Sequence, residues 1–385
     1  MSKKIRWGVL STAAIGVKKV LPAMQLGQLT SVDAIASRDL AKAQEAASAL
    51  GIPTAYGSYE ELLADPNIDA IYNPLPNQLH VPWTIKAAEA GKHVLCEKPL
   101  SLTVAEAETL LAVRTRTGVK IGEAFVIRSY PQWLRLRELL SEGHIGELRS
   151  VVGYFSYFNI DPANIRNQVE SGGGALMDIG CYLIHASRYA FAQEPTRVVA
   201  LIERDPQMHT DRLTSAILDF PAGQSIFTCS TQLVPYQRVH FLGTRGRIEL
   251  EIPFNAPIDR PTQLLIETAA IYLAQASPSR SFRFTISTRC KAMLSQMPFW
   301  MTQKCLYRLK TPSATWPQLK PSSTLPPPAS GSRCSDRRLK PSSTKPREDD
   351  GQPPRLRRAG ASILQQRACL RRMECPGWGH ARCWD

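Results

Sequence analysis

A lysine directly follows a short apolar run in the segment HVLCEKPLSL, which occupies residues 93–102. The run VLC has the composition of a buried strand, and Glu97, Lys98 and a proline come next. Two interpretations are open. The polar pair can simply end a strand that the proline stops, or the strand carries Lys98 to the rim of a site, where its ammonium can lower the pKa of a neighbouring acid.

Three further residues that can do chemistry lie at helical spacing in the segment GGGALMDIGCYLIH. Asp178, Tyr182 and His185 fall at positions i, i+4 and i+7, so a helix presents all three on one face. They can be ordinary polar packing, in which a buried tyrosine finds a hydrogen-bond partner, or a proton-transfer group. If the chain also carries a cofactor domain, proton transfer is favoured, with Tyr182 taking a proton and Lys98 lowering the pKa of its phenol. Asp178 then positions the substrate or tunes the pair.

Strand-like and helix-like segments alternate over residues 1–125. The strand-like runs are KIRWGVLS, SVDAIAS, IDAIYNPLP, VLC and VKIGEAFVI. The helix-like segments are GVKKVLPAMQ, DLAKAQEAASALG, SYEELLAD, HVPWTIKAAEAG and VAEAETLLAVRTRTG. Helices of this length between strands predict parallel βαβ units in a doubly wound, Rossmann-type sheet. Ligands of such sheets bind beyond the carboxyl ends of the strands, where Lys98 lies, so a role for Lys98 in a site gains weight.

Polar pairs predict where two of these helices begin. Ser58 with Glu61, and Thr103 with Glu106, have the three-residue spacing of a capping box. Gly51 follows the second helix-like segment and is suited to end it.

The first predicted turn, LSTAAIG, stands where a dinucleotide fingerprint G-x-G-x-x-G would lie. This chain has Ser11, Ala13 and Gly16 at the three glycine positions. Small residues still let a pyrophosphate approach the backbone, and the next helix offers its N-terminal amides. The alternative is that they serve packing alone. Thr12 and Ile15 lie in the same turn and complete this set of candidate cofactor-binding residues.

The end of the second predicted strand bears on which cofactor is bound. NAD sites usually place an acidic residue there on the ribose hydroxyls, whereas this chain has Ser37 and Arg38 before Asp39. A hydroxyl and a guanidinium suit a 2′-phosphate, which favours NADP over NAD. The alternative is that Ser37 or Asp39 caps the next helix and Arg38 is solvated.

Residues 126–270 have a different pattern, rich in β-branched and aromatic side chains. LRSVVGYFSYF predicts a strand, RLTSAILDF-PAG-QSIFTCSTQL a hairpin, and RVHFLGTRGRIELEIP two further strands around a glycine turn. The segment SGGGALMDIGCYLIHASRYAF places a helix among them. We therefore expect a second, α+β domain with a largely antiparallel sheet, which serves substrate binding and oligomerisation.

The formal net charge of +14 is concentrated near the end of the chain. Residues 271–385 carry 21 Lys and Arg against 6 Asp and Glu, whereas residues 1–270 have a net charge of −1. The part with strand and helix patterns is therefore neutral, which argues against nucleic acid as a partner. The amino terminus lacks the apolar segment of a signal peptide, and no run is long enough to span a membrane. We expect a cytoplasmic protein whose Cys96, Cys181 and Cys229 are free thiols.

Residues 271–385 also differ in composition, with many Ser, Pro and Arg residues and the string KPSST at Lys320 and again at Lys340. Such composition is typical of disorder or poor packing. A second explanation is a frameshift near residue 270. From Ser287 onward, a reading shifted by two bases permits QYTLQGDAFSDAVLDDTEVPVSLED and then DAVRNMAAIEAIFD, an amphipathic helix pattern. We interpret this segment as an aberrant, out-of-frame tail that replaces the end of the second domain.

Several motifs together resemble the Gfo/Idh/MocA oxidoreductases over most of residues 1–270. They are CEKPLS, GGGALMDIGCY, IYNPLPNQLH, EAFVIRSYPQ, IGELRSV and IPFNAP. The resemblance is greatest to the branch of dimeric dihydrodiol dehydrogenases and NADP-dependent D-xylose dehydrogenases. It implies hydride transfer between a sugar or vicinal diol and NADP or NAD, with Lys98 beside the nicotinamide, Tyr182 as acid/base and Asp178 nearby. It also implies a homo-oligomer and no metal.

The resemblance adds further site residues. It places Asn77 and His80, in the P-N-x-x-H stretch, over the cofactor, and it places Arg128 and His185 at the substrate. Tyr130 stands where the family segment around Arg128 usually has a histidine. The full set of further cofactor-binding candidates is Pro74, Leu75, Asn77, His80 and Glu97.

A non-catalytic, dinucleotide-sensing regulator on the same fold is the alternative function. A sensor needs neither a lysine at the nicotinamide nor a proton-transfer tyrosine. The presence of both Lys98 and Tyr182 therefore favours an enzyme.

Overall fold

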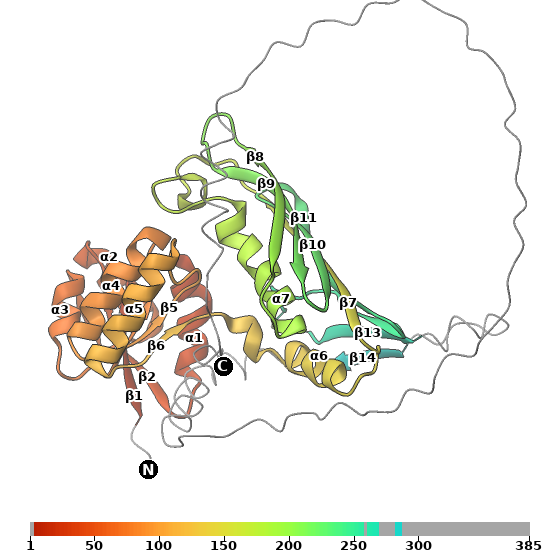
Figure 1. Cartoon of the computed structure of the whole chain (residues 1–385). Helices are drawn as coiled ribbons and strands as arrows, with labels where there is room; N and C mark the ends of the chain where they lie inside the picture. The colour runs from red at the N-terminus through yellow and green to blue at the C-terminus, as the bar shows by residue number, and fades with distance from the viewer. Residues whose placement is uncertain (1–3, 258–259, 269–281, 287–385) are drawn as a thin grey trace, which may run out of the picture. The chain divides into compact units, whose positions relative to one another are not determined.

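The computed structural model describes residues 4–257, 260–268 and 282–286 of the chain. Two sheets organise these residues, and Figure 1 shows helices packed around the first and the helices α6 and α7 beside the second. This arrangement confirms the expected fold class, a Rossmann-type parallel sheet followed by an α+β domain. The predicted properties of residues 287–385 lie outside the described residues.

The first sheet has six parallel strands in the order β3-β2-β1-β4-β5-β6. The strand order reverses between β1 and β4, and doubly wound sheets bind their ligands beyond the carboxyl ends of the strands at such a point. The strands are β1 (Ile5–Leu10), β2 (Thr30–Ala36), β3 (Thr54–Tyr56), β4 (Ala70–Asn73), β5 (His93–Cys96) and β6 (Ile121–Glu123).

Helices connect these strands as predicted, with small differences at their ends. Thr103 and Glu106 form the complete capping box of α5. At α3 only half of the predicted box forms, because Glu61 accepts a hydrogen bond from the amide of Gly57 and not from that of Ser58. The helical elements are η1 (Gly16–Val20, a π-helix), α1 (Leu21–Gln25), α2 (Leu40–Leu50), α3 (Tyr59–Ala64), α4 (Asn77–Glu89) and α5 (Val104–Thr117).

The last strand of this sheet is shorter than the segment VKIGEAFVI predicts. The amide of Ala124 donates to the carbonyl of Cys96 at 2.7 Å, and beyond that pair β5 has already ended. Without a neighbouring strand, residues Val126–Ser129 form a 3₁₀ helix, η2, which leads into α6 (Pro131–Ser141). The hydrophobic composition of this segment indicated a strand because it suits burial in either conformation.

The second sheet has eight strands in the order β14-β13-β12-β11-β7-β10-β9-β8. Its neighbours are antiparallel except for β7 and β10, which pair in parallel. The predicted hairpin forms, with Gly223 opposite Phe220. The strands are β7 (Leu148–Phe158), β8 (Arg197–Arg204), β9 (Asp211–Phe220), β10 (Gly223–Ser230), β11 (Gln232–Gly243), β12 (Gly246–Leu250), β13 (Thr262–Thr268) and β14 (Phe282–Ile286).

This sheet continues beyond Ala270, where we placed the end of the second domain. Strand β14 pairs antiparallel with β13, with Phe284 opposite Leu264. The string FRFTI alternates apolar and polar residues as a strand does, but the change in composition around it concealed that pattern. The hypothetical shifted reading starts at Ser287, directly after this strand, and residues 287–385 lie outside the described residues.

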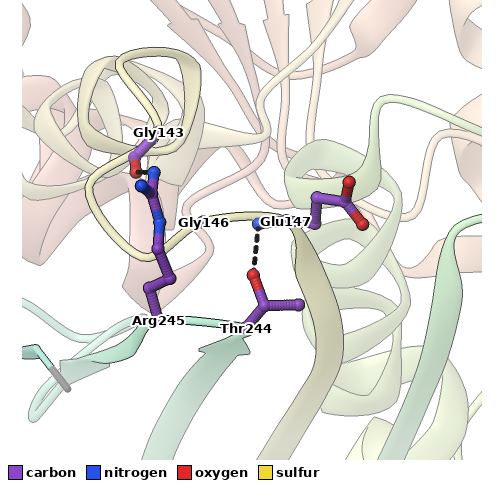
Figure 2. Close-up of a pocket in the computed structure, with 5 residues that line it drawn as sticks. All are labelled: Gly143, Gly146, Glu147, Thr244 and Arg245. Carbon is purple, nitrogen blue, oxygen red and sulfur yellow. Dashed lines mark hydrogen bonds between the residues drawn. The ribbon is translucent and has the colours of Figure 1, made fainter. Parts of the chain in front are cut away.

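The turn between β11 and β12 packs against the loop that precedes β7 (Figure 2). The amide of Glu147 donates to the hydroxyl of Thr244 at 3.1 Å, and Arg245 donates to the carbonyl of Gly143 at 3.0 Å. These residues and Gly146 line a cavity of about 530 Å³. None of the residues singled out from the sequence lines this cavity, so it is not part of the candidate site.

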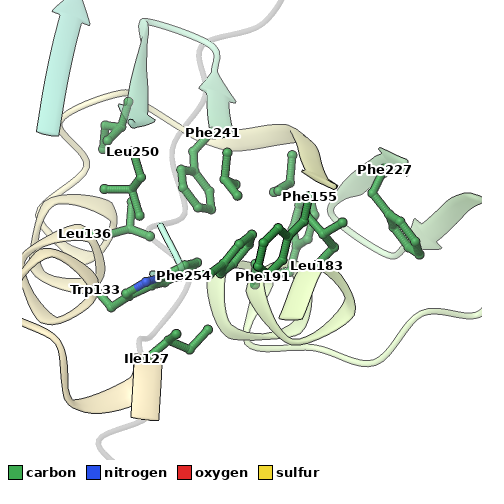
Figure 3. Packing of buried hydrophobic residues seen from close by; sticks show 14 of the residues in the cluster. Ile127, Trp133, Leu136, Phe155, Leu183, Phe191, Phe227, Phe241, Leu250 and Phe254 are labelled. Carbon is green, nitrogen blue, oxygen red and sulfur yellow. The ribbon is translucent and has the colours of Figure 1, made fainter. Parts of the chain in front are cut away.

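The main hydrophobic core lies between one face of the second sheet and the helices α6 and α7 (Figure 3). Helix α7 (Cys181–Phe191) is preceded by a π-helical turn, η4 (Leu176–Gly180). Trp133 of α6 stacks on Phe254 and donates its indole N–H to the carbonyl of Pro253 at 2.8 Å. Each fully buried apolar side chain contributes about 1.5–3 kcal/mol, so this core holds α7 firmly against the sheet.

Apolar side chains are also exposed on the other face of the second sheet. Val199 of β8, Ile217 of β9 and Ile226 of β10 are 66%, 42% and 45% exposed. The strand registers place Val199 opposite Ile217, and Ile217 opposite Ile226, so the three side chains form a continuous row across the sheet. No helix of the described residues is long and apolar enough to cross a membrane.

Candidate active site

Lys98 lies two residues beyond the end of β5, and its side chain is only 14% exposed. Its ammonium donates to the main-chain carbonyl of Asp178 at 2.5 Å and reaches the carboxylate Oδ1 of Asp178 at 3.3 Å. Glu97 is not its ion-pair partner, because that carboxylate accepts the hydroxyl of Tyr72 at 2.7 Å. The strand therefore delivers Lys98 to the helix that carries the other candidate residues.

The turn after Lys98 is held by two buried polar side chains. Glu123, at the end of β6, accepts the amide of Leu100 at 2.9 Å. His80 lies with its two ring nitrogens 2.7 Å from the carbonyl oxygens of Leu75 and Pro99. His80 is 1% exposed and ties α4 to the turn that follows Lys98, and its contact with the cofactor stays a prediction.

The first turn of the helix that begins at Leu176 depends on a carboxylate from β9. Asp211 accepts the amide of Leu176 at 2.7 Å and the hydroxyl of Thr214 at 3.1 Å. Gly174 has a φ of +118°, and a Cβ there would lie 2.0 Å from Oδ1 of Asp211. A residue without a side chain is therefore required for this carboxylate to reach the helix N-terminus, where a negative charge is favourable.

Asp178, Tyr182 and His185 lie along one side of this helix, although its first turn is π-helical and not α-helical. Tyr182 and His185 both pack against Phe125, with ring centroids 5.0 and 4.4 Å apart. The ammonium of Lys98 lies 4.9 Å from the centroid of the Tyr182 ring. The structure thus brings together an ammonium, a carboxylate and a phenol from separate parts of the chain, as π-helical turns frequently do at functional sites.

Burial and the charges around Lys98 set the protonation states of this group. Burial works against ionisation of Asp178, but Lys98 and Arg166 outweigh it and hold the pKa of that carboxyl below its usual value. Burial likewise works against Lys98, yet Tyr182 and Asp178 raise its pKa overall. At neutral pH this pair is an ammonium and a carboxylate.

Tyr182 differs from the prediction. Burial raises the pKa of its phenol, and the nearby Lys98 ammonium lowers it only in part, so the pKa lies above its ordinary value. Lys98 acts in the expected direction, but burial is the larger effect. Tyr182 is therefore a neutral phenol at neutral pH. It can donate a proton in this state, and it must lose its own proton before it can accept another.

His185 is a neutral imidazole at neutral pH. Burial lowers its pKa to about 3, and the positive charges of Arg128 and Arg188 act in the same direction. Its Nε2 is buried and has no hydrogen-bond partner among the described residues. Gln132, next to the family segment around Tyr130, donates to the carbonyls of Ile252 and Pro253 and so serves packing.

The predicted pyrophosphate turn lies at the carboxyl end of β1, beside the reversal of strand order. Ser11 adopts a φ of +90°, and its hydroxyl accepts the amide of Ala13 at 3.2 Å. Thr12 and Ala13 are partly exposed, Ile15 is 40% exposed, and the next helix begins there with its amides facing the turn. This set of hydroxyls and amides fits a dinucleotide.

The sequence allowed the end of β2 to be either a helix cap or a site for the 2′-phosphate, and the structure has features of both. Asp39 caps α2 by accepting the amides of Ala41 and Lys42. The hydroxyl of Ser37, which is 8% exposed, accepts the amide of Asp39 at 3.2 Å. Arg38 is exposed and acts electrostatically on the buried Tyr59. The helix cap therefore does not engage the Arg38 guanidinium, which is exposed and hydrogen-bonds with Tyr59.

Helix α4 contacts the glycine-rich loop before η4. Asn77, its first residue, donates from its side-chain amide to the carbonyl of Gly172 at 2.9 Å. Pro74 and Leu75 are buried at the end of β4. These candidate residues therefore lie where the end of the first sheet meets the loop that leads to Asp178.

Four residues of this arrangement were missed by the sequence analysis. They are Glu123 of β6, Tyr157 of β7, Arg166 of the 3₁₀ helix η3 (Ile165–Asn167) and Asp211 of β9. Glu123 begins the motif EAFVIRSYPQ but was not singled out, and the other three lie in no motif, because packing between distant segments places them. Among the described residues, no group of three or more His, Cys, Asp or Glu side chains could hold a metal ion.

Two family models match the chain. Residues 5–125 match the model described as an oxidoreductase family with an NAD-binding Rossmann fold. Residues 133–249 match the Gfo/Idh/MocA C-terminal domain.

Individual relatives agree with these matches. An oxidoreductase of Rhizobium meliloti, ORF334, is 49% identical over 72% of this chain and 83% of its own length. D-xylose 1-dehydrogenase (NADP(+)) 2 of Haloferax volcanii is 38% identical over 74% of this chain and 88% of its own. The crystal structure of KijD10, a 3-ketoreductase from Actinomadura kijaniata in complex with NADP and TDP-benzene, has a TM-score of 0.72 at 29% identity and covers 80% of this chain and 92% of its own.

Proposed function

Because this chain belongs to the Gfo/Idh/MocA family of NAD(P)-dependent oxidoreductases, we propose that it is an NADP-dependent dehydrogenase for a sugar or a vicinal diol. The observation that carries the proposal is the contact of the Lys98 ammonium with both Asp178 and the ring of Tyr182. A relative that acts on D-xylose with NADP supports the same substrate class.

The nicotinamide, when bound, accepts a hydride from the carbinol carbon or returns it to a carbonyl carbon. The chain's own residues handle the proton. In oxidation the Tyr182 oxygen takes the proton of the reacting hydroxyl, and the Lys98 ammonium stabilises the phenolate that this requires. In reduction the neutral phenol gives its proton to the nascent alkoxide oxygen. Asp178 holds Lys98 beside the Tyr182 ring in both directions.

The direction of the Tyr182 pKa has a consequence for pH dependence. Because burial raises this pKa, the phenolate fraction is small at neutral pH and grows as the pH rises. Oxidation, which needs the phenolate, accelerates with pH, whereas reduction, which needs the phenol, does not.

The remaining candidate residues bind the cofactor or the substrate. The hydroxyls of Ser11 and Thr12, with the amides that follow them, hold the pyrophosphate. Arg38 with Ser37 binds the 2′-phosphate, and Arg128 and His185 contact the substrate. His185 stays neutral there and offers a hydrogen bond from Nε2, which is otherwise unpartnered among the described residues.

An enzyme is favoured over a dinucleotide-sensing regulator. Lys98 and Asp178 are both about 15% exposed, and taking two charges out of water is costly. A sensor that binds only the dinucleotide gains nothing from such a buried ion pair. Proton transfer from an alcohol, in contrast, requires the buried ammonium beside the phenol.

We also assign the protein to the cytoplasm. Cys96, Cys181 and Cys229 are free thiols, as suits a reducing compartment.

We infer that the protein self-associates. The exposed row of Val199, Ile217 and Ile226 forms an apolar surface of the kind that monomers rarely leave open.

A substrate panel tests the proposed function. Purified protein is mixed with NADP⁺ or NAD⁺ and a set of aldoses, cyclic vicinal diols and simple alcohols, and reduced nicotinamide is followed at 340 nm. We expect turnover with at least one sugar or diol and faster turnover with NADP⁺. Nicotinamide binding without turnover on any alcohol, at any pH up to 10, would favour the regulator instead.

A further inference from the structure

Three donors surround the carboxylate of Asp178. The Lys98 ammonium reaches Oδ1 at 3.3 Å. Oδ2 accepts two different groups, the hydroxyl of Tyr157 at 2.7 Å and the Nε–H of Arg166 at 3.2 Å. Lys98 and Asp178 are nearly buried, whereas the Arg166 side chain is 45% exposed.

Tyr157 and Arg166 come from rigid surroundings. Tyr157 lies near the end of β7, directly after Ser156, which pairs with both neighbouring strands. The carbonyl of Arg166 accepts the amide of Gly174 at 2.8 Å, and a Cβ at Gly173 would lie 2.5 Å from that carbonyl oxygen. The glycine-rich loop therefore lets the Arg166 backbone lie directly against the start of the helix that carries Asp178.

We propose that Arg166 and Tyr157 are positioning residues: they hold Oδ2 of Asp178 so that only Oδ1 faces the Lys98 ammonium, which keeps that cation beside the Tyr182 ring. A carboxylate released from these two donors can turn both oxygens toward Lys98 and form a closer, bidentate pair. Such a pair draws the ammonium away from Tyr182 and neutralises its charge. The assignment rests on the proposed role of Tyr182, whose phenolate needs that cation.

The charged and titratable groups around these residues are few. Lys98, Cys181, Glu97 and Asp178 act on Tyr182. Lys98, Arg166 and Tyr157 act on Asp178. Burial and Asp178 raise the pKa of Tyr157, so its hydroxyl stays protonated and remains a donor at neutral and moderately alkaline pH.

The test measures the ionisation of Tyr182 directly and needs no substrate. Because burial raises the pKa of this phenol, Tyr182 is replaced by the more acidic analogue 3,5-difluorotyrosine, which brings the ionisation into an accessible pH range. Its 19F signal, to which only position 182 contributes, is titrated between pH 6 and 11.5 in the full chain, with and without saturating NADP⁺. Without Arg166 or the Tyr157 hydroxyl, the Lys98 ammonium stabilises the phenolate less. The midpoint of ionisation at position 182 should therefore rise by about 0.5–1 pH unit in Arg166→Gln and in Tyr157→Phe.

Three further variants separate positioning from other effects. Arg166→Lys keeps the charge and should retain the wild-type midpoint to within about 0.3 unit. Arg149→Ala removes an exposed arginine that pairs with Glu147 and should leave the midpoint unchanged. In an Asp178→Asn background, Arg166→Gln should have less than a third of its effect, because its action runs through the carboxylate.

Identical midpoints in the wild type, Arg166→Gln and Tyr157→Phe would overturn the proposal. The proposal would also be overturned if Arg166→Gln shifted the midpoint as much in the Asp178→Asn background as in the wild type. Arg166 would then act on Tyr182 without Asp178. Because the readout is the phenol itself, the result stands whether or not any alcohol in the panel is oxidised.

Discussion

At the scale of single residues, the site depends on Lys98, which lies two residues beyond β5, and on Asp178 and Tyr182, which share a helix face. Burial raises the pKa of Tyr182, and the Lys98 ammonium lowers it only in part. We expected the opposite net direction, because the extent of burial cannot be read from the sequence. Arg166 and Tyr157 contact Asp178 through tertiary packing alone, so no pattern near them predicts it.

Cofactor selectivity is also a property of one residue. Replacing Arg38 with Ala removes the exposed guanidinium at the end of β2 and should weaken NADP⁺ binding by about tenfold or more, since a hydrogen bond to a charged group contributes about 1.5–3 kcal/mol. Binding of NAD⁺ should change little. Dissociation constants from isothermal titration calorimetry check this.

The matched control for that measurement is Lys42→Ala. Lys42 is a cation of the same region, 69% exposed, that pairs with Asp39. If both replacements weaken NADP⁺ equally, or if Arg38→Ala weakens NAD⁺ as much as NADP⁺, Arg38 has no specific role at the 2′-phosphate.

At the scale of elements, periodicity predicted most of the helices and strands, but it missed β3, β8, β13 and β14 and did not give all of the strand partners. The parallel pairing of β7 with β10 joins strands about 70 residues apart, and the intervening chain gives no local signal for it. The π-helical turn η4 was likewise unexpected, since the spacing of Asp178 and Tyr182 suits an α-helix equally well. Strand β14 was overlooked because composition was given more weight than alternation.

The start of the site helix depends on the close approach of Asp211 to Gly174. In Gly174→Ala the new Cβ would lie 2.0 Å from Oδ1 of Asp211, at a backbone φ of +118°. We expect this change to lower the free energy of unfolding by about 3 kcal/mol or more, as strain and steric conflict add. Urea unfolding followed by circular dichroism measures it.

Gly118→Ala is the control for backbone strain alone. Gly118 has a φ of +72°, and a Cβ there would have no neighbour within 4 Å. It should cost about 1 kcal/mol. Equal losses in the two variants would show that the contact with Asp211 does not matter.

At the scale of the whole molecule, the second sheet carries exposed apolar side chains on the face opposite α6 and α7. The row of Val199, Ile217 and Ile226 crosses three neighbouring strands in register. Replacing Ile226 with Glu places a charge in the middle of that row and should shift the protein from a dimer or larger oligomer to a monomer. Light scattering coupled to size-exclusion chromatography reports the mass.

Leu26→Glu is the control, because Leu26 is 64% exposed and lies outside the second sheet. It should leave the mass unchanged. A wild-type chain that is monomeric at concentrations of about 50 μM, or an oligomer indifferent to Ile226→Glu, would contradict the assignment of this face to self-association.

The central claim is that Tyr182, assisted by Lys98, transfers the proton. The most direct test is the turnover number of Tyr182→Phe on the substrate found in the panel, measured together with its dissociation constant for NADP⁺. The phenylalanine keeps the packing against Phe125 and Phe155 but lacks the hydroxyl. The account predicts a fall in turnover of about a hundredfold or more with NADP⁺ affinity unchanged to within about twofold. Near-normal turnover in Tyr182→Phe would contradict it and leave Tyr182 as a packing residue.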